Sequence, residues 1–276
     1  MYRVLFATNE PAVLEPLNQI TNWQNMSFHE PVIVSNADEA IRVMESKRID
    51  GIAYMLDSDE ARKLNFYLNN MRPSLPIFQI QRTLESQKEE IISVRRLLDR
   101  LHADMSDDVY DENAVLDILR DEVTHNLLAG NVATDAELNS TLQMLRSYVA
   151  PTKPAILFDF DLPQGEVYLS AQWHYGSERL ENALRNNFFG RYCDNIYYCV
   201  AVLTPRHIRV AACQRSDQDN LEENALVEKA NSHVEEVLEN IKEYLGLDMV
   251  ITDCHIMDQL CLLTQEHLSS GEDENN

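Results

Sequence analysis

A small set of acidic and imidazole side chains has the types and spacing that favour chemistry. Asp57 follows Ile49–Met55 in the run IDGIAYMLD, whose apolar character is typical of a strand covered by helices on both faces. Asp159 and Asp161 lie in a second apolar run, AILFDFDL, and His174 stands between two aromatic residues. These three residues form a candidate pocket. An isolated histidine in an aromatic stretch is also commonly packed, so both interpretations stay open for His174.

The residue at the end of the first run argues for a chemistry that has been lost. In doubly wound sheets, ligands and reacting groups sit at the carboxyl ends of the strands. Met55 occupies that end here, and a thioether neither accepts a phosphoryl group nor binds a hard cation. We therefore expect no phosphoryl chemistry at this position, and no catalytic residue and no metal site in the chain. Asp57, two residues further on, is the alternative, as a displaced phosphoacceptor.

The charge and composition of the chain restrict its partners. Residues 1–100 carry 14 acidic and 12 basic groups, and the remainder carries 32 acidic and 11 basic, for a net charge of −23. Nucleic-acid affinity depends on Lys and Arg contacts to phosphates, so we expect no direct nucleic-acid binding. The acidity either serves solubility or forms a docking face for a basic partner.

The ends and the cysteines indicate a cytoplasmic protein that has no contact with a membrane. No apolar run approaches the ~20 residues of a membrane helix. The start, MYRVLFATNE, lacks the pattern of a secretory signal. The five cysteines form no CxxC pair, which is typical of reduced thiols, and we expect no cofactor.

The first half alternates between strand and helix patterns, which predicts an α/β fold with a parallel sheet. Apolar periodicity and capping residues place these elements. The predicted strands cover 3–8, 32–35, 49–57 and 76–80. The predicted helices cover 10–21, 37–48, 58–71, 85–101, 113–129 and about 135–148.

In order and length, these elements resemble the receiver domain of two-component response regulators, a CheY-like, doubly wound (βα)5 domain. The resemblance places degenerate residues at every phosphorylation-site position: Thr8, Asn9, Met55, Gln81 and Asp108. Thr8 and Asn9 replace paired carboxylates that would hold magnesium, and Asp108 replaces the lysine that would pair with a phosphoaspartate. The resemblance therefore implies a pseudo-receiver, with its fifth strand in HADMSDDVYD and its last helix at 113–129.

The part after residue 150 predicts an α+β domain with an antiparallel sheet. Strands are expected at 155–162, 166–172, 195–203, 208–213 and 249–254, and helices at 177–189 and 221–245. The order strand, helix, hairpin, helix, strand resembles a degenerate GGDEF-like palm domain. In that family acidic residues hold two metals, and Asp159 and Asp161 match the first set. The hairpin tip, TPRH at 204–207, has neither the glycines nor the carboxylate of an active cyclase.

The segment LRDEVTHNLLAGN resembles the junction of YesN-type, AraC-family response regulators. Those proteins continue into a helix-turn-helix pair, whereas this sequence ends in acidic residues, so both a naturally short chain and a truncated transcription regulator stay open. We predict a pseudo-receiver core at 1–111, the last receiver helix and a connector at 112–150, a GGDEF-like domain at 151–255 and an acidic tail at 256–276.

The resulting functional hypothesis is a non-enzymatic signalling protein that acts through protein contacts. The alternatives are a small-ligand sensor and a remnant nucleotide cyclase that uses Asp159 and Asp161. A salt-sensitive homodimer is also expected, because Ile92, Arg95, Arg96 and Arg100 are predicted to lie beside the acidic stretch 104–111.

Overall fold

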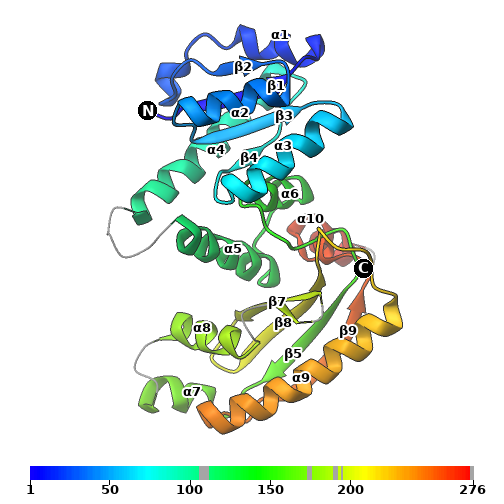
Figure 1. Cartoon of the computed structure of the whole chain (residues 1–276). Coiled ribbons are helices and arrows are strands. Elements are labelled where there is room, and N and C mark those ends of the chain that lie inside the picture. The colour runs from blue at the N-terminus through cyan, green and yellow to red at the C-terminus, as the bar shows by residue number, and fades with distance from the viewer. Residues whose placement is uncertain (106–111, 173–175, 189–191, 194, 274–276) are drawn as a thin grey trace. The chain divides into compact units, whose positions relative to one another are not determined.

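The computed structural model of the chain describes residues 1–105, 112–172, 176–188, 192–193 and 195–273 (Figure 1). The chain divides into two compact units. The first unit comprises Met1–Leu119 and Gln143–Ser147, and the second comprises Arg120–Leu142 and the chain from Tyr148 onward. One boundary between the units falls inside α5 (Glu112–Leu128), and another falls inside α6 (Asp135–Met144).

The first unit contains a parallel sheet of four strands. These strands are β1 (Val4–Thr8), β2 (Val32–Val34), β3 (Gly51–Met55) and β4 (Ile77–Phe78), in the order β2-β1-β3-β4. All three pairings are parallel. The connections run in opposite directions on either side of β1, so the carboxyl ends of β1 and β3 flank a topological switch point.

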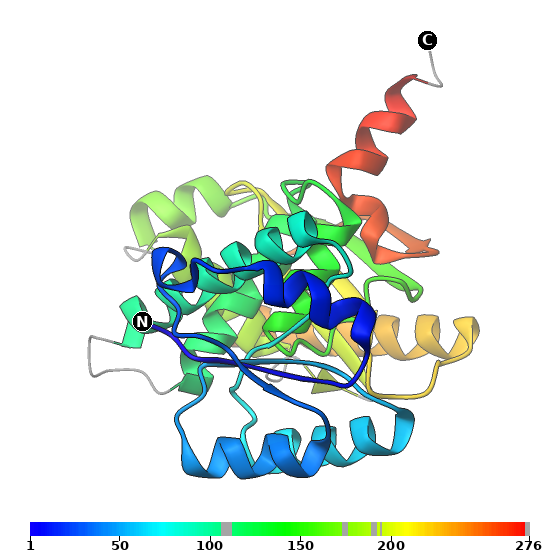
Figure 2. The ribbon, with the colours of Figure 1, turned by 90° about the horizontal axis from the view of Figure 1, so that it is seen from above.

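Helices cover both faces of this sheet. Figure 2 shows α2 (Ala37–Ser46) and α3 (Ser58–Met71) on one face, and α1 (Pro11–Gln19) and α4 (Leu84–Met105) on the other. Side chains of a strand alternate between faces, so Leu5 joins the cluster under α2 and α3 while the Phe6 ring meets Phe78 edge-on at 5.5 Å between ring centroids. The predicted α/β fold of this half is confirmed.

The predicted fifth strand is not found where the sequence placed its start. Helix α4 continues to Met105, so His102 and the three residues after it are helical. Ile91, Val94, Leu98 and Leu101 keep their helical spacing and are buried. Tyr2 holds the last turns, because its hydroxyl donates to Asp99 at 2.7 Å and its ring stacks on His102. Asp108 and the rest of 106–111 lie outside the described residues.

Two capping boxes predicted from the sequence are confirmed. Asn36 accepts from the Glu39 amide at 2.9 Å and starts α2, and the Glu39 carboxylate accepts in return from the Ser35 amide. At the start of α6 (Asp135–Met144), the Thr134 hydroxyl accepts from the Glu137 amide at 3.2 Å, and the Glu137 carboxylate accepts from the Ala133 amide at 3.3 Å. Each helix therefore begins where local hydrogen bonds satisfy its first amides.

The second unit contains an antiparallel sheet of five strands. Its strands are β5 (Ala155–Asp161), β6 (Tyr192–Cys193), β7 (Ile196–Val202), β8 (His207–Gln214) and β9 (Val250–Met257), in the order β6-β7-β8-β5-β9. All neighbours pair antiparallel. The predicted antiparallel sheet and its hairpin β7–β8 are confirmed.

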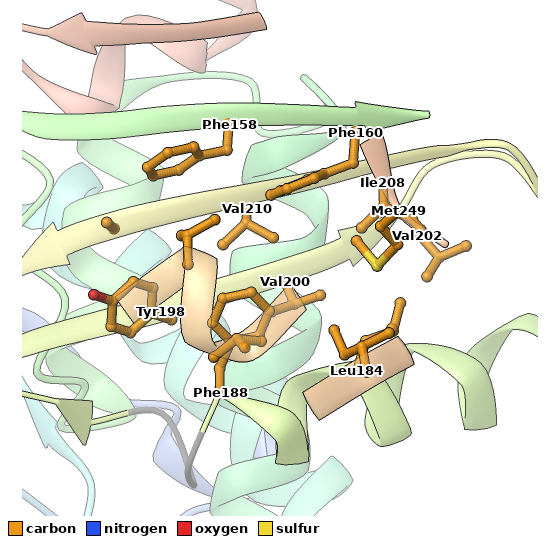
Figure 3. Packing of buried hydrophobic residues seen from close by; sticks show 14 of the residues in the cluster. Phe158, Phe160, Leu184, Phe188, Tyr198, Val200, Val202, Ile208, Val210 and Met249 are labelled. Atoms are coloured by element: carbon orange, nitrogen blue, oxygen red, sulfur yellow. The ribbon is translucent and has the colours of Figure 1, made fainter. Parts of the chain in front are cut away.

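Both faces of this sheet are also covered. Helices α8 (Ser177–Asn187) and α9 (Glu223–Leu245) close one face over a core in which Phe158, Tyr198 and Phe188 point toward one another (Figure 3). The end of α5, α6 and the short helix η4 (Leu260–Leu263) close the other face through Leu127, Leu138 and Leu260. The buried faces of the central strands therefore belong to two separate apolar clusters.

Two segments of the second unit differ from the sequence-based prediction. Residues 166–172, predicted as a strand, form the short helix α7 (Gly165–Val167) and a π-helical turn, η2 (Tyr168–Gln172). Gly165 and Tyr168 are buried and the two residues between them are exposed, which is helical and not strand spacing. Residues 256–273, expected in an acidic tail, contain the end of β9, η4 and α10 (Gln265–Asp273). The burial of Leu260, Cys261 and Leu263 explains why this segment forms regular structure.

Within the described ranges, no helix has the length and apolar character needed to cross a membrane.

Candidate functional site

The carboxyl ends of β1 and β3 carry the uncharged residues Thr8, Asn9 and Met55. Thr8 and Met55 are register partners at the ends of β1 and β3. Thr8 is buried, and its hydroxyl accepts from the Glu10 amide at 3.2 Å. Asn9 is exposed beside it. This edge therefore offers a hydroxyl, an amide and a thioether in place of a carboxylate pair, a set that magnesium does not favour.

The end of β4 is occupied by a hydrogen-bonded amide network. The backbone amide of Gln81 donates to the side-chain oxygen of Gln87 at 2.8 Å. The backbone amide of Gln79 donates to the Glu90 carboxylate at 3.1 Å. Gln87 and Glu90 are both buried on α4. The network fastens the loop after β4 to α4, so Gln81 acts as part of a fixed connection. The fifth position, Asp108, is outside the described residues.

Asp57 has a structural task. It is the N-cap of α3, and its Oδ1 accepts from the amides of Asp59 and Glu60, each at 3.1 Å. An N-cap carboxylate satisfies amides that would otherwise lack partners and interacts favourably with the positive end of the helix. A phosphoryl group on this oxygen would break both hydrogen bonds.

In the second unit, Asp159 and Asp161 lie at the end of β5 and are paired with basic residues of the neighbouring hairpin. Asp159 accepts from Arg209 at 2.8 and 3.2 Å and lies 2.6 Å from His207 Nε2. Asp161 accepts from Arg206 at 3.1 and 2.9 Å. Burial alone raises the pKa of Asp159, but hydrogen bonds from Arg209 and His207 outweigh it and hold that pKa below its usual range. Both carboxylates are therefore neutralised in place.

The hairpin tip also packs directly on the chain that follows β5. The Leu162 amide donates to the Arg206 carbonyl at 2.7 Å. Gly165 lies so close to the Pro205 carbonyl that a side chain there would overlap it. The hairpin tip and the chain after β5 are therefore in direct backbone contact, with no room for a side chain between Gly165 and Pro205. His174, the third residue of the predicted pocket, is outside the described residues.

The chain matches no protein-family model, and a comparison with curated proteins finds no relative.

A buried charge network in the second unit was not predicted from the sequence. Arg185 of α8 contacts Asp121 of α5 at 3.1 Å and Glu181 at 2.6 Å, and Glu181 contacts His125 of α5 at 2.8 Å. The exposed fractions of the Arg185, Glu181 and Asp121 side chains are 5%, 12% and 13%. Glu181 also accepts from the Val202 amide at 2.8 Å. Asp121 and His125 lie in LRDEVTHNLLAGN, so ionic contacts tie this segment to α8, and Glu181 in turn is hydrogen-bonded to the sheet.

This network predicts a pH dependence for the second unit. The Glu181 hydrogen bond raises the pKa of His125 against the opposing effect of burial. Burial raises the pKa of Glu181, but the His125 and Val202 hydrogen bonds outweigh it, so that pKa is lowered. The His125 contribution to stability is complete below about pH 6.5 and is lost as pH rises through its raised pKa. The Glu181 contribution is complete above about pH 4.5 and is lost as pH falls through its lowered pKa.

We therefore expect His125→Gln to destabilise the second unit more at pH 6 than at pH 8. Hydrogen exchange of the buried β7 and β8 amides, corrected for intrinsic exchange rates at each pH, measures this difference. His29→Gln, an exposed substitution in the first unit, is the control and should leave these amides unchanged. An equal effect of His125→Gln at both pH values would contradict the assignment.

The first unit has a cavity at the opposite, amino edge of its sheet. Its volume is about 370 Å³, and its lining includes Arg48, Asp50, Arg72, Leu98 and His102. Arg48 pairs with Asp50 at 3.0 Å, and Arg72 donates to the Met44 carbonyl at 3.0 Å. The pocket predicted from the sequence lies in the second unit, and the phosphorylation-site positions lie at the carboxyl edge of the first sheet. This cavity therefore belongs to neither of these two predicted sites.

The residues of the expected dimer surface share one side of α4. Ile92, Arg96 and Arg100 are exposed and Arg95 is partly exposed, with an ion pair from Arg95 to Asp99 at 3.3 Å. Most of the acidic stretch expected to face them, 106–111, is outside the described residues.

Proposed function

We propose that this chain is a non-enzymatic signalling protein, an atypical response regulator that acts through protein contacts and independently of aspartate phosphorylation. The observation that carries the proposal is the carboxyl edge of the parallel sheet. Thr8 and Met55 lie side by side where metal and acceptor carboxylates would be needed, and Asp57 is engaged as a helix cap. The first unit would therefore keep a fold that can bind a protein partner, and its sheet edge would lack the groups for phosphoryl transfer.

The receiver-like assignment of the first unit draws support from its topology. The order β2-β1-β3-β4 with helices on both faces is the first part of the doubly wound order 2-1-3-4-5. Many functions share this topology, so the fold alone assigns no activity. The replaced residues at the carboxyl edge favour the pseudo-receiver over an active phosphoacceptor.

The second unit would be a palm-like domain without cyclase activity. Its elements β5, α8, the hairpin β7–β8, α9 and β9 follow the order that suggested a GGDEF-like domain. The remnant-cyclase alternative needs Asp159 and Asp161 free to hold metal. Their ion pairs to Arg209, His207 and Arg206 instead favour a structural role.

Self-association through α4 is the form of protein contact that we propose for the first unit. The exposed arginines beside Ile92 suit an isologous contact with an acidic strip on a second copy. Pairs at an exposed rim weaken as salt shortens the Debye length, so this dimer should be salt-sensitive.

We expect no phosphoryl adduct when the whole chain is incubated with acetyl phosphate and magnesium. The reason is the missing metal site at Thr8 and Asn9 together with the capping role of Asp57. Intact mass spectrometry measures the outcome. A stoichiometric adduct that disappears in Asp57→Ala but persists in Asp59→Ala would show a displaced acceptor and overturn the proposal. Asp59 is the matched control because it lies in the same exposed turn.

Sedimentation of the same samples tests the contact part of the proposal. A dimer at low salt that dissociates at ~0.5 M salt, with no change on adding acetyl phosphate, is the expected result. A monomer at both salt concentrations and at high protein concentration would exclude the dimer and leave a different protein as the partner.

A further inference from the structure

Three side chains of metal-ligand type converge in the second unit, where the end of the described chain meets α6. Asp135 is the first residue of α6, Cys261 lies in η4, and His267 lies in the first turn of α10. One carboxylate oxygen, the thiol sulfur and one ring nitrogen all lie within 4.8 Å of one another. Asp135 Oδ2 and His267 Nε2 are 3.0 Å apart.

The backbone fixes the segments that supply these side chains. The amides of Gln265 and Glu266 donate to the carbonyls of Val132 and Ala133 at 2.8 and 3.2 Å, which fastens the start of α10 beside the start of α6. The Cys261 amide donates to the Pro151 carbonyl at 2.9 Å. The three side chains are therefore held together by contacts that do not depend on them.

A second layer of hydrogen bonds orients the carboxylate. The buried Thr264 hydroxyl donates to Asp135 Oδ1 at 2.9 Å, which leaves Oδ2 directed at His267. Glu266 Oε1 accepts from the Asp135 amide at 2.6 Å and lies 3.9 Å from His267 Nε2. Such outer partners are typical of protein metal sites, where they orient the ligands and tune their affinity.

We propose that Asp135, Cys261 and His267 bind one divalent transition-metal ion of the zinc class. Thiolate, imidazole and carboxylate together suit a borderline-soft ion, whereas calcium and magnesium take oxygen ligands. The thiol proton is released to solvent as the sulfur binds the ion. Three protein ligands leave a fourth position, which the neighbouring Glu266 carboxylate or a water molecule fills.

The distances are compatible with tetrahedral coordination. Ligand bonds of about 2.0–2.3 Å place pairs of ligand atoms about 3.3–3.8 Å apart. Asp135 and His267 are 3.0 Å apart and no separation exceeds 4.8 Å, so side-chain movements of about 1 Å complete the geometry. His267 and Asp135 are 39% and 33% exposed, which leaves a path for the ion from solvent.

Cobalt binding by the whole chain, after removal of metal with a chelator, tests the proposal. We expect one ion per chain and a thiolate-to-cobalt charge-transfer band in the near ultraviolet. The band should disappear in Cys261→Ser and persist in Cys254→Ser, because Cys254 is an exposed cysteine on β9 of the same unit. This pair separates the proposed site from incidental thiol binding.

A second pair of variants guards against misfolding after substitution of the buried cysteine. His267→Asn should weaken zinc binding at least tenfold, measured by calorimetry, and His255→Asn on β9 should leave it unchanged. Zinc should also slow hydrogen exchange across 260–268 in the wild type but not in His267→Asn. No zinc binding by the wild type, or binding equally strong in His267→Asn, would overturn the site and leave the cluster as a hydrogen-bonded contact between α6 and α10.

Discussion

Replacing Arg185 with leucine is expected to destabilise the second unit by about 3 kcal/mol, because the change removes the guanidinium that two poorly exposed carboxylates both contact. Asp121 and Glu181 contact the guanidinium at 3.1 and 2.6 Å, and Arg185 also donates to Asn182 at 2.6 Å. The estimate is at the lower end of the range for broken buried pairs because both carboxylates keep some solvent contact. Hydrogen exchange of the β7 and β8 amides measures the free energy of opening for this unit.

Two comparisons separate lost charge from lost packing at Arg185. Asn186→Leu on the exposed part of α8 is the control and should change stability by less than about 0.5 kcal/mol. The double variant D121L/R185L should be more stable than R185L alone, since it removes one of the two carboxylates that lose their contact with the guanidinium. A loss below about 1 kcal/mol for R185L, or no recovery in the double variant, would show that the network contributes little to stability.

Sequence reasoning located α5 but not the network that its polar residues form. Helical periodicity predicts one apolar stripe on α5. Val123 in this stripe is partly buried, and its other four residues are buried: Val115, Leu116, Leu119 and Leu127. Asp121 and His125 stand on another face of the same helix, where charged residues are ordinarily solvated. Their partners are about 60 residues away in α8, and no local pattern identifies a partner at that separation.

The accurate predictions share a local physical cause. Capping boxes at Asn36 and Thr134 depend on side chains three residues apart, and the hairpin β7–β8 depends on two neighbouring runs and a short turn. Residues 166–172 were predicted wrongly because their shape is imposed by the hairpin tip, which lies about 40 residues later in the chain. The proposed metal ligands were missed for the same reason, since Asp135 and His267 are 132 residues apart.

The candidate pocket includes two carboxylates that the GGDEF-like resemblance singled out, Asp159 and Asp161. In the structure both carboxylates contact the hairpin β7–β8. The resemblance did not indicate that Arg206, His207 and Arg209 would pair with them. Alternate residues of a strand share one face, so Arg209 and His207 reach Asp159 together, and this pairing follows from strand register.

Gly165→Ala is expected to destabilise the second unit by about 3 kcal/mol or to displace the hairpin tip. A Cβ at Gly165 would overlap the Pro205 carbonyl oxygen, lie 2.7 Å from its carbon and meet Leu162 Cδ2 at 3.3 Å. The obstacle is a backbone carbonyl, so no side-chain rotation relieves the overlap. The hydrogen bond from the Leu162 amide to the Arg206 carbonyl, at 2.7 Å, also holds the two segments together. Hydrogen exchange of the amides in 162–168 and 203–207 measures the loss of stability and shows where in the unit it occurs.

Gly246→Ala is the matched control, because it separates backbone conformation from steric overlap. Gly246 has a left-handed φ of 68° and open space around its Cβ position, so alanine there should cost about 1 kcal/mol through conformation alone. A larger loss at Gly165 than at Gly246, confined to the contact between α7 and the hairpin tip, is the expected result. Equal losses would mean that the hairpin tip gives way easily, and a tip that opens at low cost would restore room beside Asp161 for a ligand.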